Sequence, residues 1–260
     1  MGVLSNPEAL TWAVAAKRSG RIQTLVAGPN VVDLPSENSG ILRDPAIDVV
    51  VTASAWVRDL FISIAPEMEE RLVAWPVGVP VSSATGQRRF PVHPKAPWLV
   101  YDKTGLGGKD VLGAVLRELT RRGLRYHIIR CGRYRPWQYK LALLGAPAAV
   151  FISPSETQGI AQLEAWAAGV PTLVWDRGFY ESTNGLLKWY GASSCPYLGA
   201  KAGMRFRSAS EFREALDLFI QRLNTFAPRD YVREHFSLEA AAQTYVKLFA
   251  QNVVVTVRAQ

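Results

Sequence analysis

The chain has 260 residues, 48% of them apolar, and a formal net charge of +8. A chain of this length and composition can bury a substantial core in one large or two small domains, which argues against disorder. It contains neither a positively charged start followed by an apolar run nor a stretch of about 18 uncharged apolar residues. The sequence therefore predicts a cytoplasmic protein without a secretory leader or a membrane-spanning helix.

Apolar periodicity predicts helices that alternate with strands along the chain. The predicted elements before residue 91 are a helix over 7–17, strands over 21–27 and 47–52, a helix over 53–64 and a strand over 71–75. The predicted strands after residue 97 are 98–101, 126–130, 148–152 and 171–175, and the predicted helices are 109–122, 137–144, 159–168, 210–223 and 237–250. Such alternation is typical of α/β folds with parallel sheets and crossover helices.

A proline-rich stretch separates the two groups of elements. Three prolines between Pro91 and Pro97 disfavour both a helix and a central strand, so this stretch is the predicted linker. We place a partial N-terminal, acceptor-side α/β lobe at residues 1–93 and a doubly wound, Rossmann-like donor-binding domain at residues 94–260. In doubly wound domains, ligands bind at the carboxyl ends of the strands.

The basic excess lies in the second part of the chain. Residues 1–95 hold nine Lys or Arg and nine Asp or Glu, whereas residues 96–260 hold 21 and 13. The densest basic group runs from Arg117 to Lys140 and predicts an anionic partner: nucleic acid, an anionic membrane surface or a phosphorylated ligand. A solvated helix face is the alternative for the stretch from Arg117 to Arg125.

The most informative run, residues 153–171, follows a predicted buried strand and enters a helix. The free N–H groups and the positive dipole end of such a helix suit an anion such as a diphosphate, and Gly159 allows close approach to the backbone. Glu164 lies near the helix face that packs on the sheet, where a carboxylate needs partners, and ribose hydroxyls are suitable donors. The alternatives are a loop or capping carboxylate for Glu156 and a buried ion pair with an arginine for Glu164.

A second polar loop, residues 102–109, follows the strand predicted over 98–101 and carries three glycines. Lys103 and Lys109 flank these glycines, and glycine-rich backbone with ammonium groups is a common arrangement for binding phosphate. Neither the P-loop pattern GxxxxGK[ST] nor a GxGxxG fingerprint is present. A flexible turn is the alternative interpretation.

Together these stretches resemble the retaining glycosyltransferases with the two-lobed GT-B fold, the group 1 or family 4 type. The family pattern SxxEGFGxxxxEAxAxGxP is matched at its spacing by Glu156, Gly159, Glu164, Ala165, Ala167, Gly169 and Pro171. The resemblance implies that Lys103 and Lys109 neutralise the donor diphosphate. It also implies that Glu164 holds the ribose and that Glu156, the catalytic candidate, lies against the donor sugar. The implied donor-binding residues are Lys103, Lys109, Tyr134, Gly159, Ile160 and Glu164.

Several features depart from that family pattern. Lys103 replaces the more usual arginine and lacks its planar fork. Thr157 and Gln158 stand where many members have Gly-Phe, and residues 1–90 look like only the second half of an acceptor lobe. In the family, the nucleotide base of the donor tends to lie on the loop after the strand that is predicted here over 126–130. Tyr134 lies on that loop, and its ring would stack on the base, with core packing as the alternative.

The predicted function is transfer of a hexose-like sugar from a nucleoside-diphosphate donor to a hydroxyl acceptor, with retention of anomeric configuration. Two ammonium groups and a helix N-terminus would stabilise the departing diphosphate, so no metal or cofactor is expected. The expected partners are a nucleotide sugar and a lipid-linked acceptor, reached peripherally at the inner membrane face, and nucleic acid is not expected. The alternatives are a sugar-nucleotide-binding protein with little or no activity, a nucleic-acid-binding module and a sugar-nucleotide epimerase.

Overall fold

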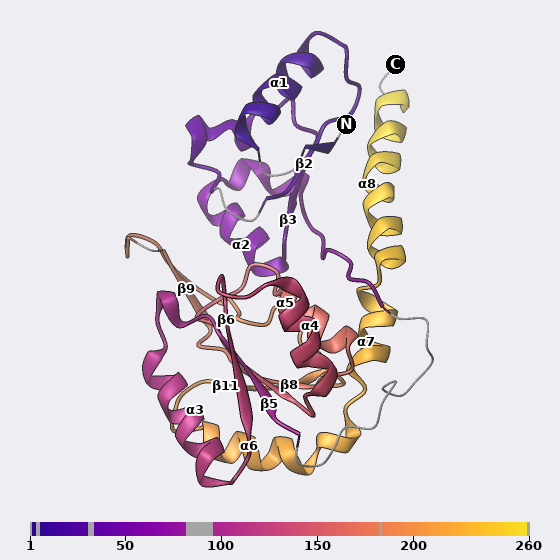
Figure 1. Cartoon of the computed structure of the whole chain (residues 1–260). Helices are drawn as coiled ribbons and strands as arrows, with labels where there is room; N and C mark the ends of the chain where they lie inside the picture. The colour runs from indigo at the N-terminus through magenta and orange to yellow at the C-terminus, as the bar shows by residue number, and fades with distance from the viewer. Residues whose placement is uncertain (1, 4–5, 31–33, 82–95, 183, 259–260) are drawn as a thin grey trace. The chain divides into compact units, whose positions relative to one another are not determined.

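The computed structural model describes residues 2–3, 6–30, 34–81, 96–182 and 184–258 (Figure 1). The chain forms two compact units. Unit 1 comprises Met1–Gly78 and Glu239–Gln260, and unit 2 comprises Val79–Leu238. The linker and the domain boundary predicted near residue 93 fall largely within 82–95, outside the described residues.

Unit 1 is built on a four-stranded parallel sheet in the order β1-β2-β3-β4. The strands are β1 (Gly2–Val3), β2 (Val26–Asn30), β3 (Val49–Thr52) and β4 (Leu72–Ala74). The helices of its first segment are α1 (Pro7–Arg18), η1 (Asn38–Arg43), α2 (Ala55–Ile64) and η2 (Pro66–Arg71). Asn6 caps the N-terminus of α1, because its side-chain oxygen accepts the Ala9 N–H at 2.9 Å.

The last helix, α8 (Leu238–Arg258), completes the core of unit 1. Trp75 donates its indole N–H to the Ala241 carbonyl at 2.9 Å, and its ring lies 4.9 Å from that of Tyr245. Leu248 is buried with Val26 and other apolar side chains of β2 and β3. The sequence predicts this helix over 237–250, and it runs further, to Arg258.

Unit 2 is built on a five-stranded sheet in the order β11-β8-β7-β5-β6, and every strand pair in it is parallel. The strands are β5 (Trp98–Asp102), β6 (Tyr126–Arg130), β7 (Ala149–Ile152), β8 (Thr172–Trp175) and β11 (Gly203–Phe206). The three central strands, β5, β7 and β8, are buried along their whole length. Burial on both faces explains their continuous apolar sequences.

Helices cover both faces of this sheet (Figure 1). On one face, α3 (Lys109–Arg121) and α6 (Phe212–Gln221) bury side chains such as Val115 and Leu216 against Val150. On the other face, α4 (Pro136–Gly145) and α5 (Ile160–Ala167) bury Leu143 and Ala165. The predicted α/β class with a doubly wound parallel sheet is therefore confirmed.

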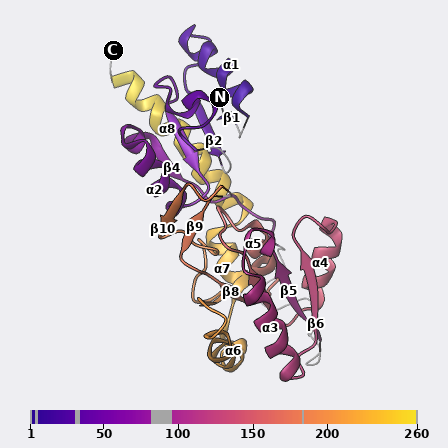
Figure 2. The same cartoon turned by 90° about the vertical axis from the view of Figure 1, so that its left-hand side faces the viewer.

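Four elements of unit 2 are additional to those the sequence predicts. They are the antiparallel hairpin of β9 (Phe179–Glu181) and β10 (Lys188–Tyr190), which Figure 2 shows side by side, the strand β11 and the helix α7 (Pro228–His235). Two short turns, η3 (Thr104–Leu106) and η4 (Leu223–Thr225), complete the unit. The hairpin directly follows β8 and forms a separate two-stranded sheet.

Candidate functional site

The strand order places a topological switch point between β5 and β7. After β5 the chain enters α3 on one face of the sheet, and after β7 it enters α5 on the opposite face. Ligands of open α/β sheets bind in the crevice that such a switch opens at the carboxyl ends of the strands. The two loops that the sequence singles out, after Asp102 and after Ile152, both lie at this point.

The first loop is held in a defined shape by the end of β5. The Lys103 N–H donates to the Ile152 carbonyl of the neighbouring strand at 2.9 Å. The Asp102 carboxylate accepts the Thr104 N–H at 3.0 Å and the Thr104 hydroxyl at 2.7 Å. Gly108, with a φ of +94°, precedes the first turn of α3, and a Cβ there would overlap the Trp175 ring. The loop therefore presents Lys103 and Lys109 from an ordered backbone.

The structure brings Lys103 and Glu156 together across the two loops. The Lys103 Nζ lies 2.9 Å and 2.8 Å from the two carboxylate oxygens of Glu156, with side-chain exposures of 33% and 15%. Lys109 is the first residue of α3 and is exposed. No ion pair of Lys109 occurs among the described residues. One cation of the loop is thus paired with the catalytic candidate, and the other faces solvent.

The second loop leads into the N-terminus of α5. Gly159 precedes the helix in the left-handed region, with a φ of +74°, and a Cβ would lie 2.9 Å from the Gln162 side-chain oxygen. Ile160 begins the helix and is 48% exposed. The helix N-terminus thus has an accessible first turn at the switch point, which is the arrangement that binds anionic groups.

Glu164 lies half-buried in the middle of α5. Burial raises the pKa of this carboxyl, and the positive charge of Lys140 opposes that shift. In the described part of the chain, no hydrogen bond or ion pair to an arginine holds its carboxylate. Glu164 in turn contributes to a raised pKa of Tyr139, after burial of that phenol. The carboxylate is therefore partly desolvated, and no described residue donates a hydrogen bond to it.

Asp176, which the sequence does not single out as a site residue, supports the loop that carries Glu156. Its carboxylate accepts the Ser193 hydroxyl at 2.7 Å and the Ser194 N–H at 3.0 Å. The Ser193 carbonyl accepts the Glu156 N–H at 3.0 Å, and the Ser194 hydroxyl donates to the Ser153 carbonyl at 2.7 Å. The loop after β7 is thus fixed from the segment that follows the hairpin.

Gln158 sits in the same loop and is buried. Its side-chain nitrogen has no hydrogen-bond partner within the part of the chain that the structure describes. An unpaired buried amide costs about 1–3 kcal/mol, so this side chain adds a local cost beside Gly159.

Tyr134 lies after β6, near the carboxyl end of the sheet, and packs in the core cluster beside α4. Its hydroxyl is 3.3 Å from that of Tyr101, and its ring centroid is 5.6 Å from that of Tyr139. Trp137, one turn further along, is 55% exposed. Stacking of Tyr134 on a base stays a prediction, and Trp137 offers the more accessible aromatic face.

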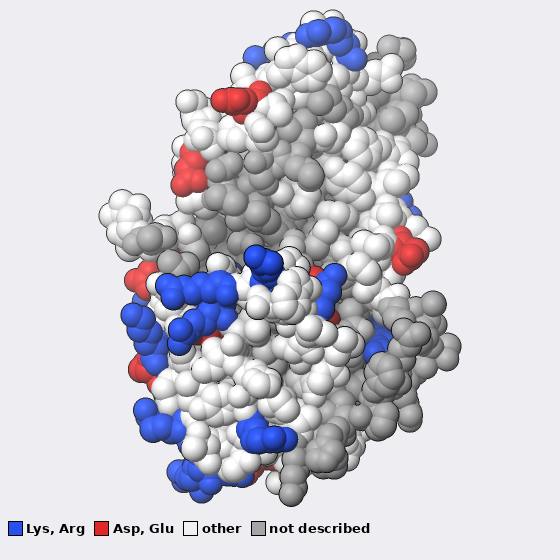
Figure 3. All heavy atoms as spheres, viewed as in Figure 1, with Lys and Arg blue, Asp and Glu red and all other residues white. Residues whose placement is uncertain are grey.

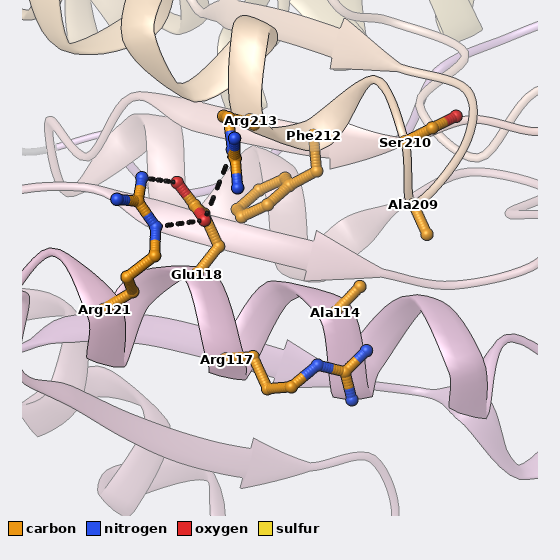
Figure 4. Close-up of a pocket in the computed structure, with 8 residues that line it drawn as sticks. All are labelled: Ala114, Arg117, Glu118, Arg121, Ala209, Ser210, Phe212 and Arg213. Carbon is orange, nitrogen blue, oxygen red and sulfur yellow. Dashed lines mark hydrogen bonds and ion pairs between the residues drawn. The ribbon is translucent and has the colours of Figure 1, made fainter.

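A cavity of about 430 Å³ lies elsewhere, between α3 and α6 (Figure 4). The Glu118 carboxylate lies between guanidinium groups there, 2.6 Å from Arg121 and 3.7 Å from Arg213. Hydrogen bonds from Arg121 and then Arg122 lower the pKa of Glu118 to about 2. Arg117, on the cavity wall, points away from this carboxylate (Figure 4). Much of the predicted basic group on α3 therefore forms a local ion-pair network away from the switch point.

Among the described residues, no group of three or more His, Cys, Asp or Glu side chains is arranged to hold a metal ion. None of the helices described is long and apolar enough to cross a membrane.

The fold is that of the GT-B glycosyltransferases, because solved structures of this fold align with nearly the whole chain. The lipopolysaccharide outer core galactosyltransferase WaaB, in its apo form, is 15% identical with a TM-score of 0.61, over 98% of this chain and 75% of WaaB. HepE from Anabaena, solved with UDP and glucose, is 13% identical with a TM-score of 0.59, over 96% of this chain and 78% of HepE.

A third structure is a variant of TarM from S. aureus, solved with Fondaparinux, alpha-GlcNAc-glycerol and UDP. It is 13% identical with a TM-score of 0.59, over 92% of this chain and 58% of TarM. No protein-family model and no curated protein sequence matches the chain. At these identities the similarity shows the fold alone, and it confirms the predicted GT-B-like class.

Proposed function

We propose that this protein transfers a hexose-like sugar from a nucleoside-diphosphate donor to a hydroxyl acceptor, with retention and without a metal ion. The observation that carries the proposal is the meeting of Lys103 and Glu156 at the switch point, beside the exposed first turn of α5. Cations and helix N–H groups suit the diphosphate, and a carboxylate suits the hydroxyls of the sugar.

In the donor complex, the diphosphate would replace Glu156 as the ion-pair partner of Lys103. A diphosphate carries more negative charge than one carboxylate, so it would attract the Lys103 ammonium more strongly, and Lys109 adds a second cation from α3. The released Glu156 is then available to the donor sugar. The same two cations stabilise the charge that develops on the leaving diphosphate, which is the main electrostatic requirement of the transfer.

Glu164 would hold the ribose of the donor. Its half-buried carboxylate, whose pKa burial raises, has unused acceptor capacity that two hydroxyl donors would fill. TarM and HepE were both solved with UDP, which supports a nucleotide as the ligand of this fold. We further propose a cytoplasmic location and a lipid-linked acceptor.

Calorimetry with UDP, GDP and ADP tests the donor site. Lys109→Ala should weaken nucleoside-diphosphate binding by about 10- to 100-fold, the value of one lost charge-assisted hydrogen bond. Arg117→Ala removes a cation two turns along the same helix and is the matched control, with unchanged affinity expected. Equal affinity in Lys109→Ala and the wild type would refute the placement of the phosphate site.

A transfer and donor-hydrolysis assay on the full chain separates the two remaining functions. Release of free sugar or transfer to a hydroxyl acceptor, abolished by Glu156→Gln, supports the transferase. Tight donor binding with no turnover under any acceptor would instead favour a sugar-nucleotide-binding protein.

A further inference from the structure

The cavity between α3 and α6 is lined by basic side chains that the function proposed above does not use. Its volume is about 430 Å³, within the range of about 300–1,000 Å³ that is usual for pockets that hold small molecules. Its lining contains three arginines, Arg117 and Arg121 on α3 and Arg213 on α6, and one acid, Glu118. Figure 3 shows Lys and Arg side chains over the part of unit 2 where α3 lies in Figure 1. The cavity is therefore large enough for a small organic ion, and its walls are basic.

The cavity is separate from the proposed donor site. Lys109, the cation proposed to hold the donor diphosphate, is the first residue of α3, whereas Arg117 lies two turns further along the same helix. At about 1.5 Å per residue, roughly 12 Å of helix separates their Cα atoms. A ligand in the cavity would therefore not occupy the switch point between β5 and β7.

Glu118 holds Arg121 and Arg213 beside the cavity. Its buried carboxylate accepts a hydrogen bond from Arg121 at 2.6 Å, and the Arg213 Nε lies 3.7 Å away. Hydrogen bonds from Arg121 and Arg122 lower the pKa of Glu118 to about 2, so the carboxylate is charged at neutral pH. The side chains of Arg121 and Arg213 are 57% and 67% exposed, so further N–H groups of both are accessible. Because ion pairs already order both side chains, an anion that binds them loses little affinity to side-chain ordering.

Arg117 supplies a cation that no internal partner neutralises. Among the described residues, no hydrogen bond or ion pair of its side chain occurs, and the residue is exposed. Its guanidinium group points along α3 toward Ala114 and away from Glu118 (Figure 4). A guanidinium has five N–H donors in a planar fork that matches the oxygens of a phosphate. The donors of Arg117 are therefore available to a ligand in the cavity.

We propose that the cavity between α3 and α6 binds a small soluble phosphomonoester. Three guanidinium groups and one carboxylate give the lining a net charge of +2. This charge balances the charge of about −1.5 to −2 that a phosphomonoester carries at about pH 7. Arginines from two helices hold the phosphate oxygens through charge-assisted hydrogen bonds, which are stronger than neutral ones. A cavity of this size leaves room beside the phosphate for an organic group, next to Ala114 and Ala209.

The grouping of the charges favours a single phosphate over nucleic acid. Arg121 and Arg213 converge on one carboxylate, and all three arginines line one recess. The phosphates of a nucleic acid are instead spread along an extended backbone and are matched by cations in a stripe or along a helix. The recess therefore suits a small molecule.

Calorimetry on the full chain tests the site without any enzymatic readout. Glycerol phosphate and phenyl phosphate should bind, whereas glycerol and phenol should not, because the recognised group is the phosphate. Arg117→Ala should weaken the binding of both esters about tenfold, the value of one lost charge-assisted hydrogen bond. Arg133→Ala is the matched control, because Arg133 is an exposed arginine outside the cavity lining, and it should bind both esters like the wild type.

Two further variants distinguish the cavity from the donor site and from general charge. Ala114→Phe places a larger side chain in the cavity without changing its charge and should abolish the binding of both esters. Lys109→Ala should leave the affinity for the esters unchanged and weaken UDP binding, and Arg117→Ala should do the reverse. Arg117→Ala changes an exposed helical residue and keeps the fold, so the test does not depend on Ala114→Phe alone.

Each of four results would overturn the proposal. Failure of both esters to bind the wild type at millimolar concentration would exclude a phosphomonoester site. Wild-type affinity for the esters in Arg117→Ala would exclude the cavity, and an equal loss in Lys109→Ala would place the esters at the donor loop. Binding of single-stranded DNA that is lost in Arg117→Ala and unchanged in Ala114→Phe would assign the arginines to a nucleic-acid backbone instead.

Discussion

Replacing Glu164 by glutamine should stabilise the fold and weaken the donor complex at the same time. Glu164 is half-buried on α5, and burial raises the pKa of its carboxyl, with no arginine among the described residues paired to it. The folded state therefore binds its proton more tightly than the unfolded state. The favourable contribution of Glu164 is complete below the unfolded pKa and is lost as pH rises through the folded pKa, so at neutral pH the charged group destabilises the protein.

The effect of Glu164→Gln on binding has the opposite sign. Glutamine keeps one side-chain acceptor oxygen but loses the charge and the second acceptor. One hydrogen bond to a charged group is worth about 1.5–3 kcal/mol, which corresponds to a loss of nucleotide affinity of about 10- to 100-fold. A loss of this size lies well within the range of calorimetric titration with UDP, GDP or ADP.

Thermal unfolding and calorimetry on the same samples check both signs. The unfolding midpoint of Glu164→Gln should exceed that of the wild type at about pH 7.5, and the difference should vanish at about pH 4. Glu214→Gln, on an exposed carboxylate of α6, serves as the control and should change neither quantity. A lower midpoint at neutral pH together with unchanged nucleotide affinity would show that Glu164 is held by partners within the fold, and would refute the reasoning.

Three further outcomes follow from the structure. Lys103→Ala should weaken UDP binding about 10- to 100-fold and leave the weaker binding of uridine unchanged, as titrations of both ligands would show. Gly108→Ala should lower the free energy of unfolding by about 1–3 kcal/mol, because of its positive φ and the Trp175 ring, whereas Gly145→Ala in α4 should not; urea titration measures both. The pKa of Glu118 is lowered from 4.5 to about 2, so its carboxylate stabilises the fold at pH values above 4.5. The wild type should therefore melt at a higher temperature than Glu118→Gln above pH 4.5, and this difference should disappear as the pH falls from about 4.5 to about 2.

Periodicity in the sequence was enough to predict four of the five strands of the unit 2 sheet, β5, β6, β7 and β8, but not the edge strand β11. Strands such as β7 are continuous apolar runs with polar loops at both ends, and burial on both faces is what such runs require. The β9–β10 hairpin was not predicted, because its short strands mix aromatic with charged residues and resemble a loop. The Asn184-Gly185 pair was the available signal, since this dipeptide is strongly associated with hairpin turns.

The candidate site was predictable in its parts but not in its contacts. The spacing of Glu156 and Glu164 and the two lysines are local patterns, and they mark two loops. The pairing of Lys103 with Glu156 depends on the adjacency of β5 and β7, which periodicity does not define. The support from Asp176 was missed for the same reason, since its serine partners lie beyond the hairpin in the chain.

Three buried carboxylates of unit 2 differ from Glu164 in their hydrogen-bond partners, and this difference is itself an argument for a ligand. Asp102 and Asp176 accept several hydrogen bonds within the fold, and Glu118 is surrounded by guanidinium groups. Glu164 has no such donors among the described residues, and the buried amide of Gln158 also lacks a partner. Folding alone selects against such uncompensated groups, whereas a ligand that supplies donors and acceptors makes them useful. Gln158 lies in the loop that follows β7, and Glu164 lies in the helix that follows this loop. The free-energy cost of both groups therefore falls in the region where the nucleotide sugar is proposed to bind.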